Sequence, residues 1–353
     1  MAELNGEIVF ERRGAAGLVT LNRPKALNAV THGMVLALRA QLVAWASDPA
    51  ISRVIVTAEG DRAFSAGGDI RALYDLGQAG KHDEALQFWR DEYPLNALIK
   101  RYPKPYIALI DGIVMGGGVG VSVHGSHRVA GDRFQLAMPE VGIGFFPDVG
   151  ATWFLPRLPG ELGAYCALTG ERFNADDAMA AGLATHRIPS ARFPELLDGL
   201  CGTVPADAVL AALTKPPGEE TMLRRVAIDR LFAGGRVEDI LTQLDRDAAS
   251  GTPDAAWSGK TAALMRTKSP LSLKIALAQV RRGKTWDFDT CMRTEFRIVS
   301  RIIHGHDFYE GVRAVIVDKD NKPRWNPAAL AAVAESDVDR YFAPRGADEL
   351  VLP

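Results

Sequence analysis

The chain has 353 residues, with 41 lysines and arginines against 43 aspartates and glutamates, and its formal net charge is −2. It carries no basic tail, and no apolar run approaches the roughly 20 residues that cross a bilayer, so we predict neither nucleic-acid nor membrane partners. Cys166, Cys201 and Cys291 are scattered, which argues against a disulfide framework and a thiolate metal site. The scattered cysteines also lead us to expect that the protein binds no metal. The N-terminal sequence resembles neither a signal nor a transit peptide, so we expect a cytoplasmic protein.

Strand and helix patterns alternate along the first half of the chain. Ile8–Glu11 and Leu18–Asn22 are predicted to form a hairpin, and the apolar run Val54–Thr57 is typical of a buried strand. Residues 83–100 have helical periodicity, and Pro94 is expected to kink or interrupt that helix. Further expected elements are a helix over His32–Ala46, strands at Tyr106–Ile110, Val129 and Phe134–Met138, and a helix from Gly116 to about Val123. This recurrence predicts an α/β fold with stacked turns of sheet.

Beyond Pro189 the pattern becomes mainly helical. Residues 214–218, Thr-Lys-Pro-Pro-Gly, are predicted to form a turn or short linker. The predicted helices are Leu196–Leu213, Met222–Leu231, Ile240–Asp247, Ala256–Met265, Leu271–Val280 and Phe288–Ile303. We therefore divide the chain into a core over residues 1–200 and a helical C-terminal region over residues 201–353.

Two glycine-rich segments are candidates for close contact between a ligand and the backbone. Residues 64–70, Phe-Ser-Ala-Gly-Gly-Asp-Ile, are by themselves interpreted as a tight turn in which Asp69 caps the next helix. Residues 111–120 follow a strand and open a helix, and the N–H groups at a helix start suit an anion or an oxyanion. A dinucleotide fingerprint does not fit, because Val123 stands where its third glycine belongs. Three consecutive glycines from Gly116 favour a ligand-facing role over helix packing alone.

A third segment, residues 137–150, carries two carboxylates in a loop rich in glycine and phenylalanine. Glu140 and Asp148 lie eight positions apart near its two ends. Apolar neighbours raise the pKa of a carboxyl group and suit it to proton transfer or to attack on a carbonyl. Considered singly, each residue is more simply interpreted as an ordinary turn or helix residue. Their chemical role therefore depends on the other two segments.

Together with Asn22–Ala29, these three segments resemble the crotonase (enoyl-CoA hydratase/isomerase) superfamily over about residues 8–190. The resemblance implies a spiral of stacked ββα units, here followed by a mainly helical C-terminal region that completes the acyl pocket. It also implies that the backbone N–H groups of Gly68 and Gly117 form an oxyanion hole for the thioester of an acyl-coenzyme A substrate. No cofactor is implied, since coenzyme A is part of the substrate. Candidate coenzyme A-binding residues are Arg23, Lys25, Ala66, Asp69 and Ile70, and the two cations suit its phosphates.

The position of the carboxylates separates the reactions within this superfamily. Its hydratases resemble one another in two glutamates that share a water; one matches Glu140, and the other position is Gly120 here. Asp148 supplies a carboxylate where hydratases usually have glycine. This exchange resembles the 3-hydroxyisobutyryl-CoA hydrolase subfamily. Longer stretches that agree with that subfamily are residues 115–130, 137–160, 269–283 and 306–325.

The subfamily resemblance implies a substrate site and a reaction. Glu92, Gly117, Glu140 and Asp148 match its substrate-binding positions, although Glu92 read alone is interpreted as a solvated helix carboxylate. The expected reaction is thioester hydrolysis of a short β-hydroxyacyl-CoA, with 3-hydroxyisobutyryl-CoA of valine catabolism as the expected substrate. Glu140 either attacks the carbonyl to form a mixed anhydride or activates a water. Asp148 positions or deprotonates that water, or orients the substrate hydroxyl.

Two other functions remain open. A hydratase or isomerase of the same fold is opposed by Gly120, because glycine cannot act as an acid or a base. A non-catalytic assembly component should have lost its carboxylates, and Glu92, Glu140 and Asp148 are all present. A Ser–His–Asp hydrolase is not indicated, because the sequence contains no Gly-x-Ser-x-Gly. Superfamily cores commonly form trimers, so a homo-oligomer is a further expectation, which the added C-terminal helices can change.

Overall fold

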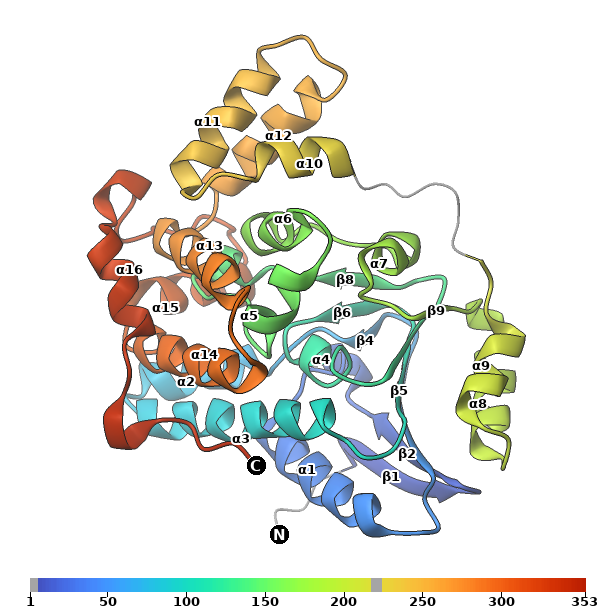
Figure 1. The fold of residues 1–353 in the computed structure, drawn as a ribbon. Helices are drawn as coiled ribbons and strands as arrows, with labels where there is room; N and C mark the ends of the chain where they lie inside the picture. The colour runs from blue at the N-terminus through green and yellow to red at the C-terminus, as the bar shows by residue number, and fades with distance from the viewer. Residues whose placement is uncertain (1–5, 217–223) are drawn as a thin grey trace.

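A six-stranded and a three-stranded sheet form the centre of the computed structural model, which describes residues 6–216 and 224–353 (Figure 1). The larger sheet has the order β1-β2-β3-β5-β7-β9, with β1 and β2 antiparallel and the other pairs parallel. The smaller sheet is parallel, in the order β4-β6-β8. The strands are β1 (Ile8–Arg13), β2 (Ala16–Leu21), β3 (Arg53–Ala58), β4 (Ala63–Ser65), β5 (Tyr106–Ile110), β6 (Ile113–Met115), β7 (His127–Ala130), β8 (Gln135–Ala137) and β9 (His186–Arg187).

Successive strands alternate between the two sheets. β3, β5 and β7 enter the larger sheet, and the strands that follow them, β4, β6 and β8, enter the smaller one. Helical turns come after each pair: α2 (Ile70–Gln78) and α3 (His82–Lys100), then α4 (Gly117–Gly120), then the 3-10 turn η2 (Glu140–Ile143). The chain therefore winds as a spiral of stacked ββα units, which confirms the predicted fold class.

Helices cover both faces of the larger sheet. Along β3, Val54 and Val56 belong to the main apolar core, whereas Ile55 between them packs in a second cluster. That second cluster is closed by α8 (Phe193–Cys201) and α9 (Ala206–Leu213). Because side chains alternate across a strand and both faces are covered, the sequence of β3 is continuously apolar.

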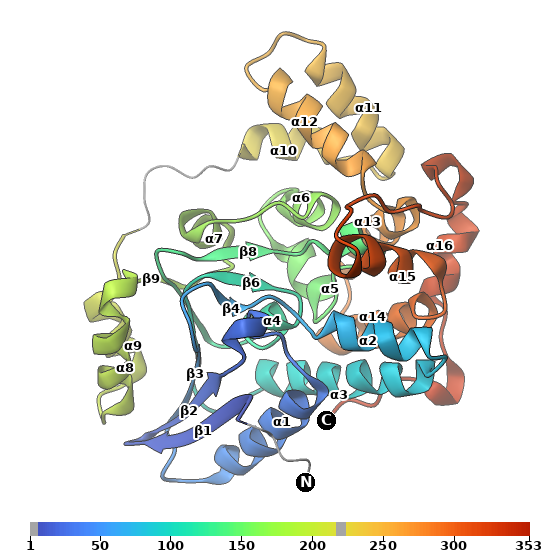
Figure 2. The ribbon, with the colours of Figure 1, turned by 180° about the vertical axis from the view of Figure 1, so that it is seen from behind.

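The C-terminal helices pack directly on N-terminal elements. α13 contacts α5 and α6, and α14 contacts α3 and α5. In both ribbon views α10, α11 and α12 project together from one end of the molecule (Figures 1 and 2). The remaining helices are α1 (His32–Ser47), α5 (Ala151–Phe154), α6 (Leu162–Thr169), α7 (Ala175–Ala181), α10 (Arg225–Leu231), α11 (Val237–Ala248), α12 (Ala255–Arg266), α13 (Pro270–Gly283), α14 (Phe288–Ile302), α15 (His306–Val312), the π-helical turn η5 (Arg313–Val317) and α16 (Glu335–Phe342).

Two predicted elements differ from the structure. α3 continues through Pro94, so the proline does not interrupt this helix; burial of the surrounding helix face offsets the backbone hydrogen bond that proline cannot donate. The predicted helix Leu196–Leu213 is two helices, because the chain turns before Pro205 and a new helix begins after it. Met222 and part of the predicted linker 214–218 lie outside the described residues.

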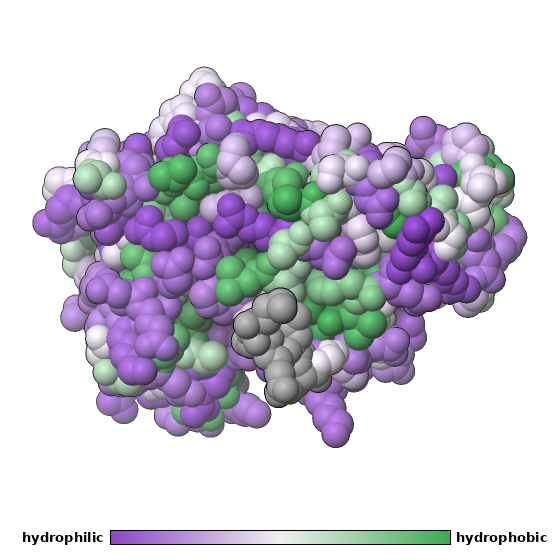
Figure 3. Space-filling view, turned by 90° about the horizontal axis from the view of Figure 1, so that it is seen from below, coloured by the Kyte–Doolittle hydropathy of each residue, from purple (hydrophilic) through white to green (hydrophobic). Residues whose placement is uncertain are grey.

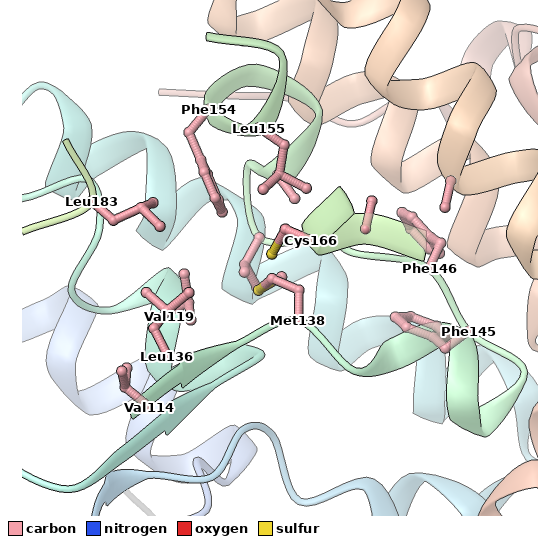
Figure 4. Close-up of a cluster of buried hydrophobic side chains, with 14 of the residues drawn as sticks. Val114, Val119, Leu136, Met138, Phe145, Phe146, Phe154, Leu155, Cys166 and Leu183 are labelled. Carbon is pink, nitrogen blue, oxygen red and sulfur yellow. The ribbon is translucent and has the colours of Figure 1, made fainter. Parts of the chain in front are cut away.

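The main apolar core contains residues from both halves of the chain. Figure 4 shows part of it, where Val114 of β6, Val119 of α4, Leu136 of β8 and Cys166 of α6 gather in one cluster. Seen from below, the surface is mostly hydrophilic, with separate apolar patches among the polar side chains (Figure 3). None of the helices in the described ranges is both long and apolar enough to span a membrane.

Candidate active site

A cavity of about 730 Å³ opens where the two glycine-rich segments meet the segment 137–150. Gly68, Gly117, Glu140 and Asp148 are all on its wall. The C-terminal region supplies Lys268, Val315, Ile316 and Asn321 to the same wall. Residues far apart in the sequence, from both predicted regions of the chain, therefore enclose one space.

Two glycine turns bring backbone N–H groups to this wall. Gly67 and Gly116 precede the two predicted oxyanion-hole residues, and their φ angles of 120° and 44° favour glycine. A Cβ atom on Gly117 would lie 3.1 Å from the backbone nitrogen of Gly68, so the two segments touch at this point. Within the described part of the chain, the N–H groups of Gly68 and Gly117 donate to no other protein group. Both can therefore donate to an oxygen of a ligand in the cavity.

Asp148 lies on the cavity wall in the loop between η2 and α5 and is only 5% exposed. The hydroxyl of Tyr93 on α3 donates a 3.0 Å hydrogen bond to its Oδ2. Burial raises the pKa of Asp148 to about 7, against the lowering effect of hydrogen bonds from Tyr93 and Trp89. A carboxyl group with this pKa can accept and release a proton near neutral pH.

Glu140 begins η2 and lies beside the second glycine turn. A Cβ atom on Gly116 would lie 3.3 Å from Oε1 of Glu140. The other carboxyl oxygen, Oε2, is buried and has no hydrogen-bond partner among the described residues. Burial, and then the charge of Asp148, raises the pKa of Glu140 well above its ordinary value. Because buried polar atoms normally have a partner, Oε2 is available to a substrate or a water.

Glu92 is buried, with 1% of its surface exposed, so the interpretation of this residue as a solvated carboxylate is wrong. The cause is its helix: the face of α3 that carries Glu92 packs into the protein beside the cavity. A Cβ atom on Gly117 would lie 2.9 Å from Oε1 of Glu92, an oxygen without a hydrogen-bond partner in the described ranges. Burial, followed by the charges of Asp148 and Glu295, raises the pKa of Glu92 well above its ordinary value. A carboxyl group kept protonated in this way can donate a hydrogen bond.

Gly120 packs against the loop of Asp148 and lies off the cavity wall. A Cβ atom on Gly120 would lie 2.8 Å from Cβ of Val149 and 2.9 Å from Nδ2 of Asn96. Val149 has a φ of 52°, an uncommon conformation for a β-branched residue, and its side chain occupies this space. A second glutamate of the hydratase kind therefore has no room at position 120 unless the loop of Asp148 moves.

Comparison with known proteins identifies the family. Residues 16–342 match the family model described as enoyl-CoA hydratase/isomerase. The chain belongs to this family. A curated relative from Danio rerio, "3-hydroxyisobutyryl-CoA hydrolase, mitochondrial", is 42% identical over 99% of this chain and 93% of its own length. The Homo sapiens protein of the same name is 39% identical over 98% of this chain and 90% of its own length. These relatives confirm the predicted subfamily resemblance.

Two solved structures share the complete fold of this family member. A carnitinyl-CoA dehydratase from Mycobacterium thermoresistibile is 43% identical, with a TM-score of 0.92 over 98% of this chain and 99% of that chain. An enoyl-CoA hydratase from Rhodobacter sphaeroides is 39% identical, with a TM-score of 0.89 over 98% of this chain and 100% of that chain. Their names denote reactions other than hydrolysis, so the choice of reaction depends on the residues of the site.

The candidate coenzyme A-binding residues of this enoyl-CoA hydratase/isomerase family member fall into two groups. Ala66, Asp69 and Ile70 line the cavity, whereas Arg23 and Lys25 are not on its wall. The guanidinium of Arg23 forms ion pairs with Asp69 at 3.1 Å and with Glu7 at 3.0 Å. Arg23 would therefore have to exchange these partners before it could bind a phosphate group.

The sequence does not predict several residues of the site. Arg71 and Lys268 are cations on the cavity wall, and burial lowers the pKa of Lys268. Tyr93, within the helix predicted over residues 83–100, donates a hydrogen bond from its hydroxyl to Asp148. Glu295 of α14 is fully buried near the same loop. The sequence does contain a sign of this burial: Glu295 follows Met292 by three positions, and both lie on the apolar face of one predicted helix.

Proposed function

We propose that this chain hydrolyses the thioester of 3-hydroxyisobutyryl-CoA, a step of valine catabolism that releases 3-hydroxyisobutyrate and coenzyme A. The observation that carries the proposal is the arrangement of carboxylates around the cavity. Asp148 lines the cavity with Glu140, while the space beside Gly120 is filled by Val149. The full-length similarity to curated 3-hydroxyisobutyryl-CoA hydrolases supports the same substrate.

In the proposed reaction the thioester carbonyl lies against the two glycine turns. Its oxygen accepts hydrogen bonds from the N–H groups of Gly68 and Gly117, which stabilise the negative charge that develops as the carbonyl is attacked. Donors fixed in the backbone need no reorganisation during the reaction, and each typically contributes about 2.7–4 kcal/mol to transition-state stabilisation.

Glu140 supplies the attack in one of two ways. As a nucleophile, its ionised carboxylate forms a mixed anhydride with the acyl group, which expels the coenzyme A thiolate, and water then cleaves the anhydride. As a general base, it removes a proton from a water that attacks the thioester directly. Asp148, with a pKa near 7, gives a proton to the departing thiolate or orients the water or the substrate hydroxyl. A single turnover in oxygen-labelled water tests the anhydride. Label found in Glu140 shows that water has cleaved an anhydride at the Glu140 carbonyl, whereas label found only in the product fits the general-base route and also cleavage at the acyl carbonyl; chemical trapping of the anhydride then separates these two.

The second candidate is a hydratase or dehydratase, because the two solved structures carry such names. That reaction in this family is expected to need a second glutamate, and position 120 has neither the side chain nor the room for it. A parallel assay decides between the candidates. We expect free thiol from 3-hydroxyisobutyryl-CoA and no loss of the crotonyl-CoA double bond; the reverse pattern would overturn the proposal.

The proposed reaction needs no cofactor, because coenzyme A enters as part of the substrate. Among the described residues, no group of three or more His, Cys, Asp or Glu side chains is arranged to hold a metal ion. We propose a cytoplasmic location, although the curated relatives are named mitochondrial, and cell fractionation tests it. A homo-oligomer is likewise a proposal, to be tested by sedimentation.

A further inference from the structure

The loop that carries Asp148 is fixed by side chains from several elements. Gln279 of α13 donates from Nε2 to the carbonyl of Pro147 and, at 2.8 Å, to the hydroxyl of Thr152. His124 bonds through Nε2 to the carbonyl of Val149 at 2.7 Å. Together with the hydrogen bond that Tyr93 donates to Asp148, these contacts restrict the conformation of the loop.

The loop needs this support because its backbone is strained next to Asp148. Val149 has a φ of 52°, in the left-handed region that is unfavourable for β-branched residues. Gly150 follows with a φ of 91°, which glycine adopts readily. The turn therefore keeps its shape only while its surroundings hold it.

Glu295 holds the backbone of this turn with its carboxylate. Its Oε2 accepts the N–H of Gly150 at 2.7 Å, and its Oε1 accepts the N–H of Thr152 at 2.8 Å. The side chain is completely buried. Burial, followed by the charge of Asp148, raises the pKa of Glu295 to about 8, whereas the two N–H groups favour the ionised form, which alone can accept both. Burying a carboxyl group is costly, so a helix face that served packing alone would more favourably carry an apolar residue here.

We propose that Glu295 is a positioning residue, which holds the strained turn at Val149 so that the carboxyl group of Asp148 faces the substrate cavity. The proposal rests on the hydrolysis proposed above, because it assigns Glu295 to the action of Asp148. It gives the C-terminal region a second role: other residues of this region line the cavity, and α14 holds the loop of Asp148, which belongs to the N-terminal core.

The test is the substitution Glu295→Gln, which keeps the size of the side chain. The amide can accept only one of the two N–H groups, and its NH₂ faces the other donor. We expect kcat for thiol release to fall about 10- to 100-fold, as small displacements of a reacting group typically cost. KM should stay within about twofold, because Glu295 itself is not on the cavity wall and the rest of the wall keeps its place. The control is Thr294→Val, a buried neighbour on α14 whose hydroxyl, among the residues that the structure describes, bonds only to Thr290 of the same helix; its kcat should equal that of the wild type.

A second background shows whether Glu295 acts through the turn. In Val149→Gly the left-handed conformation is no longer strained, so adding E295Q should lower kcat less than about threefold relative to V149G alone. A loss as large as in the wild-type background would contradict the positioning role, as would an unchanged kcat in E295Q itself. If the single variant E295Q does not fold, the kcat of V149G is compared with the kcat of the double variant, and a loss of more than about threefold contradicts the positioning role. Absence of thiol release by the wild type would instead refute the proposed function.

Discussion

Four carboxyl groups, those of Glu92, Glu140, Asp148 and Glu295, are buried around one site, and burial is the first cause of the raised pKa of each. In an unfolded chain such groups titrate at about 3.9–4.3. In the folded protein Asp148 titrates near 7 and Glu295 near 8. The contribution of a group with a raised folded pKa is fully present below its unfolded pKa and is lost as pH rises through the folded pKa. These carboxyl groups should therefore lower the stability progressively between about pH 4 and pH 8.

Replacing Asp148 by Asn should stabilise the protein while it disables the site. The amide has no proton to lose, so the Tm of D148N should exceed that of the wild type by more at pH 8 than at pH 5. Its kcat should fall, because the amide cannot exchange a proton with the reactants. Thermal unfolding at the two pH values checks the first part. A Tm difference that is the same at both would mean that the pKa of Asp148 is not raised in the folded state.

The two glycines of the predicted oxyanion hole should respond differently to alanine. A Cβ atom on Gly117 would lie 2.9 Å from the carboxyl group of Glu92 and 3.1 Å from the nitrogen of Gly68, whereas one on Gly68 meets only the ring of Phe88 at 3.3 Å. G117A retains the N–H, but the clash should move it away from the thioester oxygen and lower kcat about 100-fold or more, as the loss of an oxyanion donor does. G68A is the matched control, with an expected loss of about threefold, since a ring edge can shift. Equal losses in steady-state kinetics would contradict the proposed geometry.

At the level of the elements, the longer strands and most of the C-terminal helices follow from apolar periodicity, and the glycine-rich segments follow from their composition. The short strands β4, β6 and β9 and the helices α5, α6 and α7 were not predicted, because so few residues show no clear period. The buried carboxylates do not follow from these patterns. Glu92 and Glu295 occupy apolar faces of α3 and α14, where helical spacing alone predicts packing residues. A local pattern shows which face of a helix is apolar. It does not show which distant loop packs against that face. Glu92 was placed by family resemblance, and Glu295 was not placed at all.

The contact between α4 and the loop of Asp148 can be tested by a single methyl group. A Cβ atom on Gly120 would meet Val149 and Asn96 at 2.8 and 2.9 Å, so G120A should destabilise the protein by about 1–3 kcal/mol, as overpacking typically does. Gly259 of α12 is the control, because a Cβ atom there meets only Ala248 at 3.5 Å. G259A should be neutral or slightly stabilising, since alanine favours helices. Denaturant unfolding compares the two, and equal stability of both variants would contradict the packing described here.

At the scale of the whole molecule, the site depends on both halves of the chain. The glycine turns, Glu140 and Asp148 come from the spiral, while Lys268 and Ile316 close the cavity from the helical region. The fold class was predictable because the family motifs occur in order along the spiral. The family resemblance led us to expect that the C-terminal region completes the acyl pocket. The residues that do so could not be named, because they depend on how the C-terminal helices fold back onto the spiral. The division at residue 200 remains a prediction, since one apolar core includes residues of both parts.

In the proposed reaction, a buried carboxylate on this cavity drives hydrolysis of a β-hydroxyacyl thioester. The most direct measurement is the release of free thiol from 3-hydroxyisobutyryl-CoA by the wild type and by Glu140→Gln, with circular dichroism to confirm the fold of both. The variant retains the shape of Glu140 but can act neither as nucleophile nor as base. We predict steady turnover by the wild type and a loss of at least about 100-fold in the folded variant. Equal thiol release by both proteins would contradict the claim.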